Sequence, residues 1–261
     1  MERINLNETA YLEYAPLDKN FDGKAKPVLL ILPGGAYTHL ADHEAYPIAD
    51  AARASGMHAC ILRYTVLTER IVEIDDLLDE ISQTLDFLDS RAKEDSLDMS
   101  QVTVLGFSAG GHLAAMAANR LSDRFARACL CYPAAHMDFT EEQKASEEEA
   151  EAMAKEQGTT VEVLTKMGEF FMDWPENYIH EGSVPTFIYH SQNDPVCPIE
   201  GTLQYYSKLC AAHIPAALHV FTTGEHGKSL GNKASQLKGD DLYPELSAWW
   251  DLFQEWLALD L

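Results

Sequence analysis

A serine between two glycines is the residue of this chain whose sequence context is most typical of a reactive side chain. Residues 106–110 read Gly-Phe-Ser-Ala-Gly, a G-x-S-x-G pattern centred on Ser108. An apolar, β-branched stretch precedes it (residues 102–105), and a stretch rich in helix formers follows it (residues 111–118). A serine on a sharp strand-to-helix turn projects its hydroxyl above the edge of a sheet, and small flanking residues allow that turn. We therefore predict that Ser108 is a nucleophile; a purely structural glycine turn is the alternative.

A nucleophilic serine needs a base to remove its proton, and the base needs a third group to orient it. Asp194 follows the strand-like stretch 185–190 in an Asn-Asp-Pro turn, and His226 follows the strand-like stretch 217–221. The chain order serine, acid, histidine is the one that accompanies this type of serine turn on a parallel sheet. The sequence therefore predicts Asp194 as the acid and His226 as the base.

Other acids and histidines have weaker positions. Among the acids only Asp194 directly follows a core strand in a turn-forming context. His190 lies at a strand end before the acid loop, and His112 lies on the helix after the serine, so we expect structural roles for both. The competing acid candidates are Asp173, Glu181 and Glu225.

Backbone N–H groups that could hold a developing oxyanion are predicted at two places. Ala109 follows the nucleophile at a helix N-terminus, where amides point outward without partners. Gly35 and Ala36 belong to the segment 33–37, which follows the apolar run 28–32 and whose glycines bring the backbone close to a substrate. A tight turn with only a structural role is the alternative. Together with the serine, acid and histidine, the pattern favours the oxyanion role.

Strand-like and helix-like segments alternate along the chain, which predicts an α/β fold with a mostly parallel central sheet and helices on both faces. Apolar spacing over residues 74–88 predicts an amphipathic helix of about four to five turns. The last helix is expected from about Tyr243 to Trp256. Alternating residues in 4–6 and 11–14 predict antiparallel edge strands. We expect one domain over residues 1–261.

One segment, residues 136–180, is too long for a simple crossover. Its charge run over residues 141–151 predicts a solvated helix face, and the apolar residues after it predict a second helix. We interpret the segment as a helical cap inserted over the carboxyl ends of the strands, the alternative being a peripheral excursion. The predicted substrate-binding residues are Tyr37, Phe170, Phe171 and Trp174.

Composition excludes several classes of function. The 19 basic and 42 acidic residues give a net charge of −23, which repels phosphate backbones and anionic lipids and argues against nucleic-acid and membrane partners. No apolar run is long enough to span a membrane, and no signal peptide is visible, so we expect a cytoplasmic protein. The five widely spaced cysteines predict reduced thiols, and no metal site or cofactor is expected.

The combined motifs resemble the α/β-hydrolase superfamily over nearly the full length of the chain. Within it, the chain looks most like the esterase/lipase group that includes acetyl esterases and acetyl xylan esterases. The resemblance implies Ser108 as nucleophile, Asp194 as acid and His226 as base. The segments that carry it are 32–37, 106–112, 190–198 and 224–227.

Two departures from the family pattern bear on substrate selection rather than on the chemistry. Many relatives carry His-Gly-Gly-Gly where this chain has Pro33 to Ala36, so a bulkier residue replaces the third glycine although its amide is kept. Lys228 stands where relatives often have an aromatic residue after the His-Gly pair.

These features predict a serine carboxylesterase that acts on a small-molecule ester through an acyl-serine intermediate. The expected acyl group is short, above all acetyl, on a sugar or related alcohol. The histidine base is expected to titrate with a pKa of about 6 to 7. A peptidase of the same fold and a silent hydrolase scaffold used for binding are the alternatives. An intact serine, acid and histidine set argues against the scaffold, because binding alone does not need all three. The sequence leaves homo-oligomerisation open.

Overall fold

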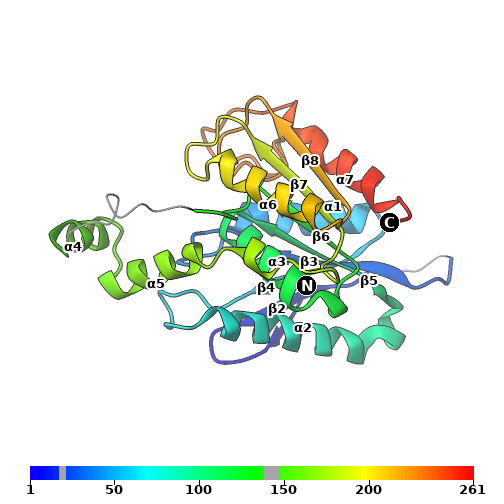
Figure 1. Ribbon diagram of the computed structural model, residues 1–261. Coiled ribbons are helices and arrows are strands. Elements are labelled where there is room, and N and C mark those ends of the chain that lie inside the picture. The colour runs from blue at the N-terminus through cyan, green and yellow to red at the C-terminus, as the bar shows by residue number, and fades with distance from the viewer. Residues whose placement is uncertain (18–21, 138–146) are drawn as a thin grey trace.

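One eight-stranded sheet forms the centre of the part of the chain that the structure describes (Figure 1). The structure is a computed structural model that describes residues 1–17, 22–137 and 147–261. The strand order is β1-β2-β4-β3-β5-β6-β7-β8. The strands are β1 (Glu2–Asn5), β2 (Tyr11–Ala15), β3 (Lys26–Leu32), β4 (His58–Arg63), β5 (Leu97–Phe107), β6 (Arg127–Cys131), β7 (Thr186–Ser191) and β8 (Ala216–Phe221).

The sheet is parallel from β4 to β8, and β1 and β2 are antiparallel additions at one edge, as the alternating N-terminal residues predict. The central strands are apolar without interruption because both of their faces are covered. In β3, Leu30 and Leu32 pack into the core on one face, whereas Leu29 and Ile31 pack into the core on the other. This pattern confirms the predicted α/β architecture.

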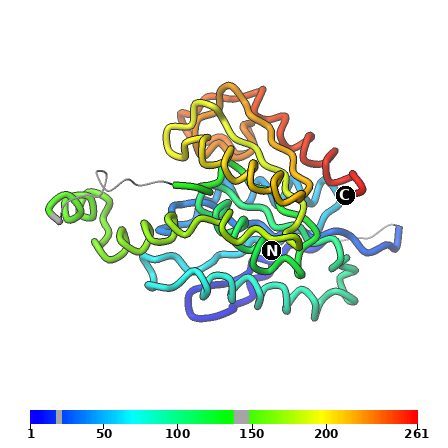
Figure 2. Tube along the Cα trace, in the orientation of Figure 1, coloured from blue at the N-terminus to red at the C-terminus, as the bar shows by residue number. Residues whose placement is uncertain are grey.

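Helices cover both faces of the sheet (Figure 2). Buried residues of α2 (Ile74–Asp95), α3 (Ser108–Arg120) and α6 (Ile199–Ala211) belong to the core on one face. Those of α1 (Tyr46–Ala54) and α7 (Trp249–Leu257) belong to the core on the other face. With helices between successive parallel strands, the carboxyl ends of β3 to β8 meet at a single edge of the sheet.

Two helix boundaries differ from the prediction. Helix α2 has 22 residues and is longer than expected, because a capping box between Glu73 and Asp76 starts it and a left-handed Ser96 ends it. The last helix starts at Trp249 rather than near Tyr243. The Tyr243 N–H donates instead to the Gly231 carbonyl, which ties this part of the backbone to a loop.

The predicted cap segment contains α4 (Glu147–Glu156), α5 (Val161–Met172) and the 3₁₀ helix η4 (Pro175–Tyr178). Residues 138–146, which include the first part of its charge run, lie outside the described residues. Helix α5 packs on the body through apolar side chains near its C-terminal end, and α4 extends outward beyond α5 (Figure 1). That the segment is a cap over the substrate, and that the chain is one domain, stay predictions.

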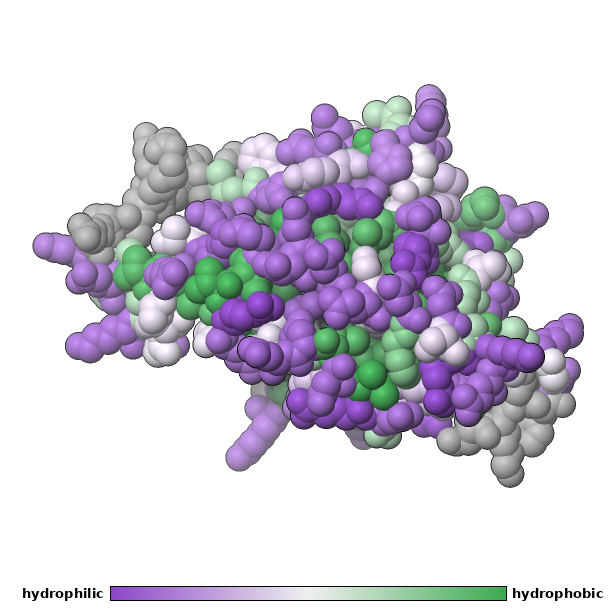
Figure 3. Space-filling view, turned by 90° about the horizontal axis from the view of Figure 1, so that it is seen from below, coloured by the Kyte–Doolittle hydropathy of each residue, from purple (hydrophilic) through white to green (hydrophobic). Residues whose placement is uncertain are grey.

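The surface agrees with the acidic composition. The face shown in Figure 3 is largely hydrophilic, with apolar residues in scattered patches. Among the described residues, no helix combines the length and hydropathy that crossing a bilayer requires. The cysteines within the described chain are free thiols, as predicted, and four of the five are buried.

Candidate active site

Ser108 lies at the turn from β5 into α3 with a left-handed backbone, φ 52°. Non-glycine residues rarely adopt this conformation, and it occurs where the surrounding structure enforces it. The two glycines of the motif allow the turn because they leave space: a Cβ on Gly106 would lie 2.0 Å from the Gly110 carbonyl oxygen, and one on Gly110 would lie 2.1 Å from the Leu32 carbonyl oxygen. The turn leaves the Ser108 side chain partly exposed at the edge of the sheet.

Ser108, His226 and Asp194 form one hydrogen-bonded chain. Nε2 of His226 lies 2.8 Å from Oγ of Ser108, and Nδ1 of His226 lies 2.7 Å from Oδ2 of Asp194. The three residues follow β5, β8 and β7, so the sheet brings together residues up to 118 positions apart. This geometry suits removal of the serine proton by an imidazole that a carboxylate orients.

Backbone amides hold the Asp194 carboxylate in place. Its Oδ1 accepts hydrogen bonds from the N–H groups of Val196 (2.8 Å) and Cys197 (2.9 Å). Burial disfavours the charged carboxylate, but hydrogen bonds from His190 and His226 and those amides outweigh burial and hold the pKa of Asp194 well below its usual range. Asp194 therefore stays ionised next to His226 at neutral pH.

The competing acids are engaged elsewhere or exposed. The exposed side chain of Glu225 forms an ion pair with Lys228 at 3.4 Å. The Asp173 carboxylate accepts a hydrogen bond from the Tyr178 hydroxyl at 2.8 Å, and Glu181 is exposed. Asp194 is thus the acid that the structure brings to His226.

The loops that carry the acid and the histidine are joined to each other. The side-chain oxygen of Asn193 accepts hydrogen bonds from the N–H groups of Gly224 (3.1 Å) and Glu225 (3.2 Å). Because Asn193 precedes Asp194 and Glu225 precedes His226, these hydrogen bonds fix the position of His226 relative to Asp194.

His226 differs from the prediction in its titration. Burial disfavours its charged form, but the interactions with Asp194 and Cys197 outweigh burial and raise the pKa of His226 to about 10. The predicted value of about 6 to 7 is that of an imidazole with little help from a neighbouring carboxylate. The sequence shows that an acid is present, but it does not show that the carboxylate is buried directly against the ring.

Three backbone amides predicted for the oxyanion belong to the start of α3 and to the loop after β3, which comes close to Ser108 at Gly34. Ala109 is the second residue of α3, so its N–H belongs to the unpaired first turn of the helix. Gly35 and Ala36 have positive φ values of 130° and 52°. No described residue accepts a hydrogen bond from either of their N–H groups. These amides remain free to bind an anion.

Glu44, which the sequence analysis did not single out, holds the loop that contains Gly35 and Ala36, which we call the oxyanion loop. Its side chain is buried (2% exposed), Oε2 accepts the Gly34 N–H at 2.8 Å, and Oε1 accepts the Tyr132 hydroxyl at 2.6 Å. The Tyr132 ring packs against the His226 ring with centroids 5.0 Å apart. The neighbouring His43 contacts the carbonyl of Gly227 at 2.9 Å through Nε2. One short turn, η1 (Asp42–Glu44), thus braces both the oxyanion loop and the histidine loop.

We expect Glu44→Ala to lower both stability and activity. It leaves the buried Gly34 N–H and Tyr132 hydroxyl without partners, which costs about 2–6 kcal/mol of unfolding free energy at about 1–3 kcal/mol for each group. Because the amides of the oxyanion loop lose their fixed position, kcat should fall on the order of tenfold or more. Urea unfolding and ester turnover measure the two effects.

Glu44→Gln is the matched variant, because its amide oxygen keeps one of the two acceptors. It should recover most of the stability and part of kcat. A folded Glu44→Ala protein with unchanged kcat would show that the brace has no role in activity.

The predicted substrate-binding aromatics lie in two environments. Tyr37 is fully buried and packs against Phe170 and Phe171, with ring centroids 5.0 and 5.6 Å away. Trp174 is partly exposed, stacks on His136 with centroids 3.9 Å apart, and donates a hydrogen bond to the Met137 carbonyl. Contact of the Tyr37 side chain with substrate would need α5 to move, and the binding role of all four residues stays a prediction.

The two other histidines of interest are buried, as their structural interpretation requires. Nε2 of His112 faces the Asp173 carbonyl at 3.0 Å, so it carries the proton, and Nδ1 then accepts the Tyr37 hydroxyl at 2.7 Å. Burial lowers the pKa of His112 to about 4, so the ring is neutral. His190 contacts the Thr202 hydroxyl and the Cys197 carbonyl. Within the described chain, no three His, Cys, Asp or Glu residues gather as metal ligands would.

Comparison with known proteins places this chain in a family. A model of the BD-FAE family matches residues 16–209. The crystal structure of a sugar hydrolase, YeeB, from Lactococcus lactis is similar to this fold with a TM-score of 0.82 and 28% identity, covering 98% of this chain and 96% of that one.

Two curated proteins are also similar. An acetylxylan esterase from Xylanibacter ruminicola is 24% identical over 89% of this chain, and endo-1,4-beta-xylanase B from Butyrivibrio fibrisolvens is 25% identical over 81% of it. The chain spans 49% and 34% of their respective lengths. Since the family model covers more than half of the chain, and the fold and strand-end geometry are those of α/β-hydrolases, the protein belongs to the BD-FAE family.

Proposed function

We propose that the protein is a serine carboxylesterase that removes short acyl groups, above all acetyl, from carbohydrates. The observation that carries the proposal is the hydrogen-bonded chain from Ser108 through His226 to Asp194. The names of its relatives, an acetylxylan esterase and a sugar hydrolase, support a carbohydrate ester as substrate.

Acylation begins when Oγ of Ser108 attacks the ester carbonyl carbon and its proton passes to Nε2 of His226. Asp194 stays ionised and stabilises the imidazolium through Nδ1. The carbonyl oxygen becomes an oxyanion, which the amides of Ala109 and of Gly35 or Ala36 bind. As the intermediate collapses, the carbon–oxygen bond to the sugar breaks, and the leaving oxygen takes the proton from His226.

Deacylation repeats these steps with water. His226 removes a proton from a water molecule that attacks the acyl-serine carbonyl, and the same amides hold the second oxyanion. The bond to Oγ of Ser108 then breaks, Oγ recovers the proton, and the carboxylic acid leaves. No step needs a group from outside the chain other than substrate and water.

The test is turnover of a chromogenic acetyl ester by the purified protein. We expect hydrolysis that EDTA leaves unchanged and that a serine-directed organophosphate abolishes, with one adduct per chain on Ser108 by peptide mass spectrometry. Activity that is sensitive to a chelator and survives the organophosphate would mean a metal-assisted mechanism. A protein that binds the ester without turnover would be a scaffold.

A further inference from the structure

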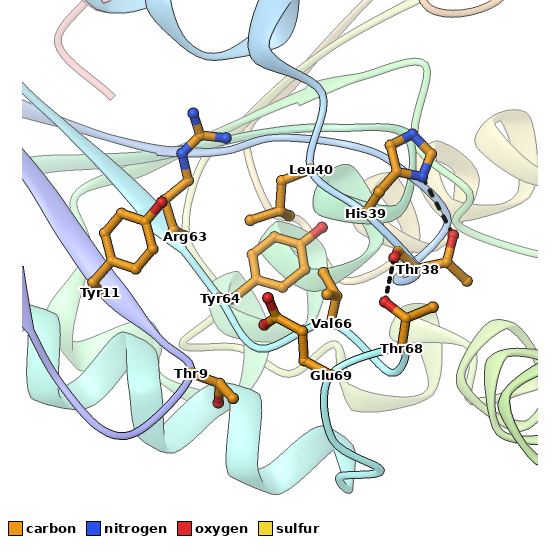
Figure 4. Close-up of a pocket in the computed structure, with 10 residues that line it drawn as sticks. All are labelled: Thr9, Tyr11, Thr38, His39, Leu40, Arg63, Tyr64, Val66, Thr68 and Glu69. Carbon is orange, nitrogen blue, oxygen red and sulfur yellow. Dashed lines mark hydrogen bonds between the residues drawn. The ribbon is translucent and has the colours of Figure 1, made fainter. Parts of the chain in front are cut away.

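A cavity of about 310 Å³ opens beside the oxyanion loop (Figure 4). Its volume is at the lower end of the range of about 300–1,000 Å³ for small-molecule sites. Its walls come from the N-terminal end of β2, the carboxyl end of β4, and the loops that follow β3 and β4. The lining residues are Thr9, Tyr11, Thr38, His39, Leu40, Arg63, Tyr64, Val66, Thr68 and Glu69.

Strand register places this cavity on the same edge of the sheet as Ser108. Leu32 of β3 pairs with Gly106 of β5, and Ile31 pairs with Ile61 of β4. Leu32 is therefore level with Gly106 on one side and with Leu62 on the other, and two residues beyond these come Ser108 and Tyr64, at about the same height. Only β3 lies between β4 and β5, so their ends are about 10 Å apart at the usual strand spacing.

The loop after β3 contacts both regions. At its start, a Cβ built on Gly34 would lie 3.0 Å from Cβ of Ser108, and further along, Thr38 and His39 line the cavity. The loop is compact, because the N–H groups of Thr38 (2.9 Å) and His39 (3.2 Å) both donate to the Gly35 carbonyl. At the cavity wall, the Tyr64 hydroxyl donates to the Pro33 carbonyl at 2.7 Å, which joins the wall to the start of this loop.

The lining favours a neutral ligand rich in hydroxyl groups. Arg63 is not available to bind an anion, because Glu13 (2.8 Å) and Asp42 (2.7 Å) already pair with its guanidinium. Among the described residues, nothing bonds to the Tyr11 hydroxyl or the Glu69 carboxylate. In Figure 4 the Glu69 carboxylate lies next to the Tyr64 ring. The carboxylate can accept hydrogen bonds from sugar hydroxyl groups, and the Tyr11 hydroxyl can both donate to them and accept from them.

We propose that this cavity binds the sugar part of the ester whose acyl group reacts at Ser108. The inference rests on the proposed esterase function, and it adds the place where the carbohydrate is recognised. The ester carbonyl lies on one side of the oxyanion loop while the sugar extends over the loop into the cavity. Tyr11 and Glu69 are specificity-determining residues in this arrangement, and they take no part in the acyl transfer.

The test compares two esters, acetylated xylobiose and 4-nitrophenyl acetate, which share the acyl group and differ in the sugar. For each protein we take the ratio of kcat/KM on the sugar ester to kcat/KM on the aryl ester. Glu69→Ala should lower this ratio about tenfold, because a hydrogen bond to a charged group is lost, and Tyr11→Phe should lower it about threefold. Tyr11→Phe removes only a hydroxyl without a protein partner, so it should fold like the wild type.

Glu255→Ala is the control, because Glu255 is exposed on α7, which packs on the core of the other face, and the ratio should not change. Ratios within twofold of wild type in both cavity variants, or equal losses on both esters, would overturn the sugar site.

A binding measurement separates failure of this site from failure of the esterase function. Calorimetry with xylobiose on the Ser108→Ala protein should show binding that Glu69→Ala weakens about tenfold. Binding without any ester turnover by the wild type would reject the esterase and keep the sugar site. Turnover of 4-nitrophenyl acetate without xylobiose binding would keep the esterase and reject the site.

Discussion

Ser108→Ala is expected to lower kcat by about 10⁴-fold or more, since loss of one member of a serine, histidine and acid set removes nucleophilic catalysis as a whole. The fold should persist. Ala36 already adopts φ 52° in this protein, the same value as Ser108, so an alanine side chain is compatible with the backbone of the turn. The substitution removes one hydroxyl at a partly exposed position and creates no buried unpaired group in the core.

Turnover and thermal unfolding of the purified variant check this result. Ser207→Ala, on the exposed side of α6, is the matched control and should retain full activity. A folded Ser108→Ala protein with kcat near that of the wild type would exclude Ser108 as the nucleophile.

Asp194→Asn is expected to cost about 10⁴-fold in kcat, whereas Glu225→Gln should cost less than about threefold. The amide oxygen of an asparagine can still accept the N–H groups of Val196 and Cys197. Its NH₂ group then faces Nδ1 of His226, so that Nδ1 becomes the acceptor and the proton moves to Nε2. With a proton already on Nε2, the imidazole cannot take one from Ser108. If Glu225→Gln were the inactive variant, the acid would have been misassigned.

The pH profile gives a second measure of the same contact. His226 acts as a base only when neutral, and its pKa is raised to about 10, so kcat/KM of the wild type should increase as the pH rises from 7 toward 10. In Asp194→Asn the interaction that raises the pKa is lost while burial, which lowers it, remains. The acid limb of the residual activity should therefore move to lower pH. An unchanged limb in the variant would mean that another group controls the profile.

The chemistry could be predicted from the sequence because each of its residues directly follows a recognisable strand. Ser108 follows β5 in a five-residue motif, and Asp194 and His226 follow β7 and β8 in the expected order. Strand positions were predictable for the same reason, because buried parallel strands are apolar without interruption. Helix ends were harder to predict. The start of α7 depends on a hydrogen bond between Tyr243 and Gly231, and no local sequence pattern shows that these two residues are close together.

Glu44 shows why other parts of the site could not be predicted. It is one of 42 acidic residues, and its importance depends on Gly34 and on Tyr132, which is 88 positions away. Glu44 comes just before helix α1, which has an apolar face. Acidic residues at that position of a helix are commonly exposed, so the position alone does not predict burial. The cavity was missed for a similar reason, because its lining combines short polar stretches from separate loops, none of which forms a motif.

The strand order has a consequence for how this enzyme could change. Reacting groups follow β5, β7 and β8, whereas the cavity is built on β2, β4 and the loop after β3. The loop after β3 is the shared boundary between these two sectors. Substitutions at cavity residues that do not bond to the oxyanion loop or to η1, such as Tyr11 and Glu69, can therefore accumulate without disturbing acyl transfer. The alcohol preference of a lineage could change by such small steps. A directed-evolution library confined to such residues should give new alcohol preferences at a low rate of inactive clones.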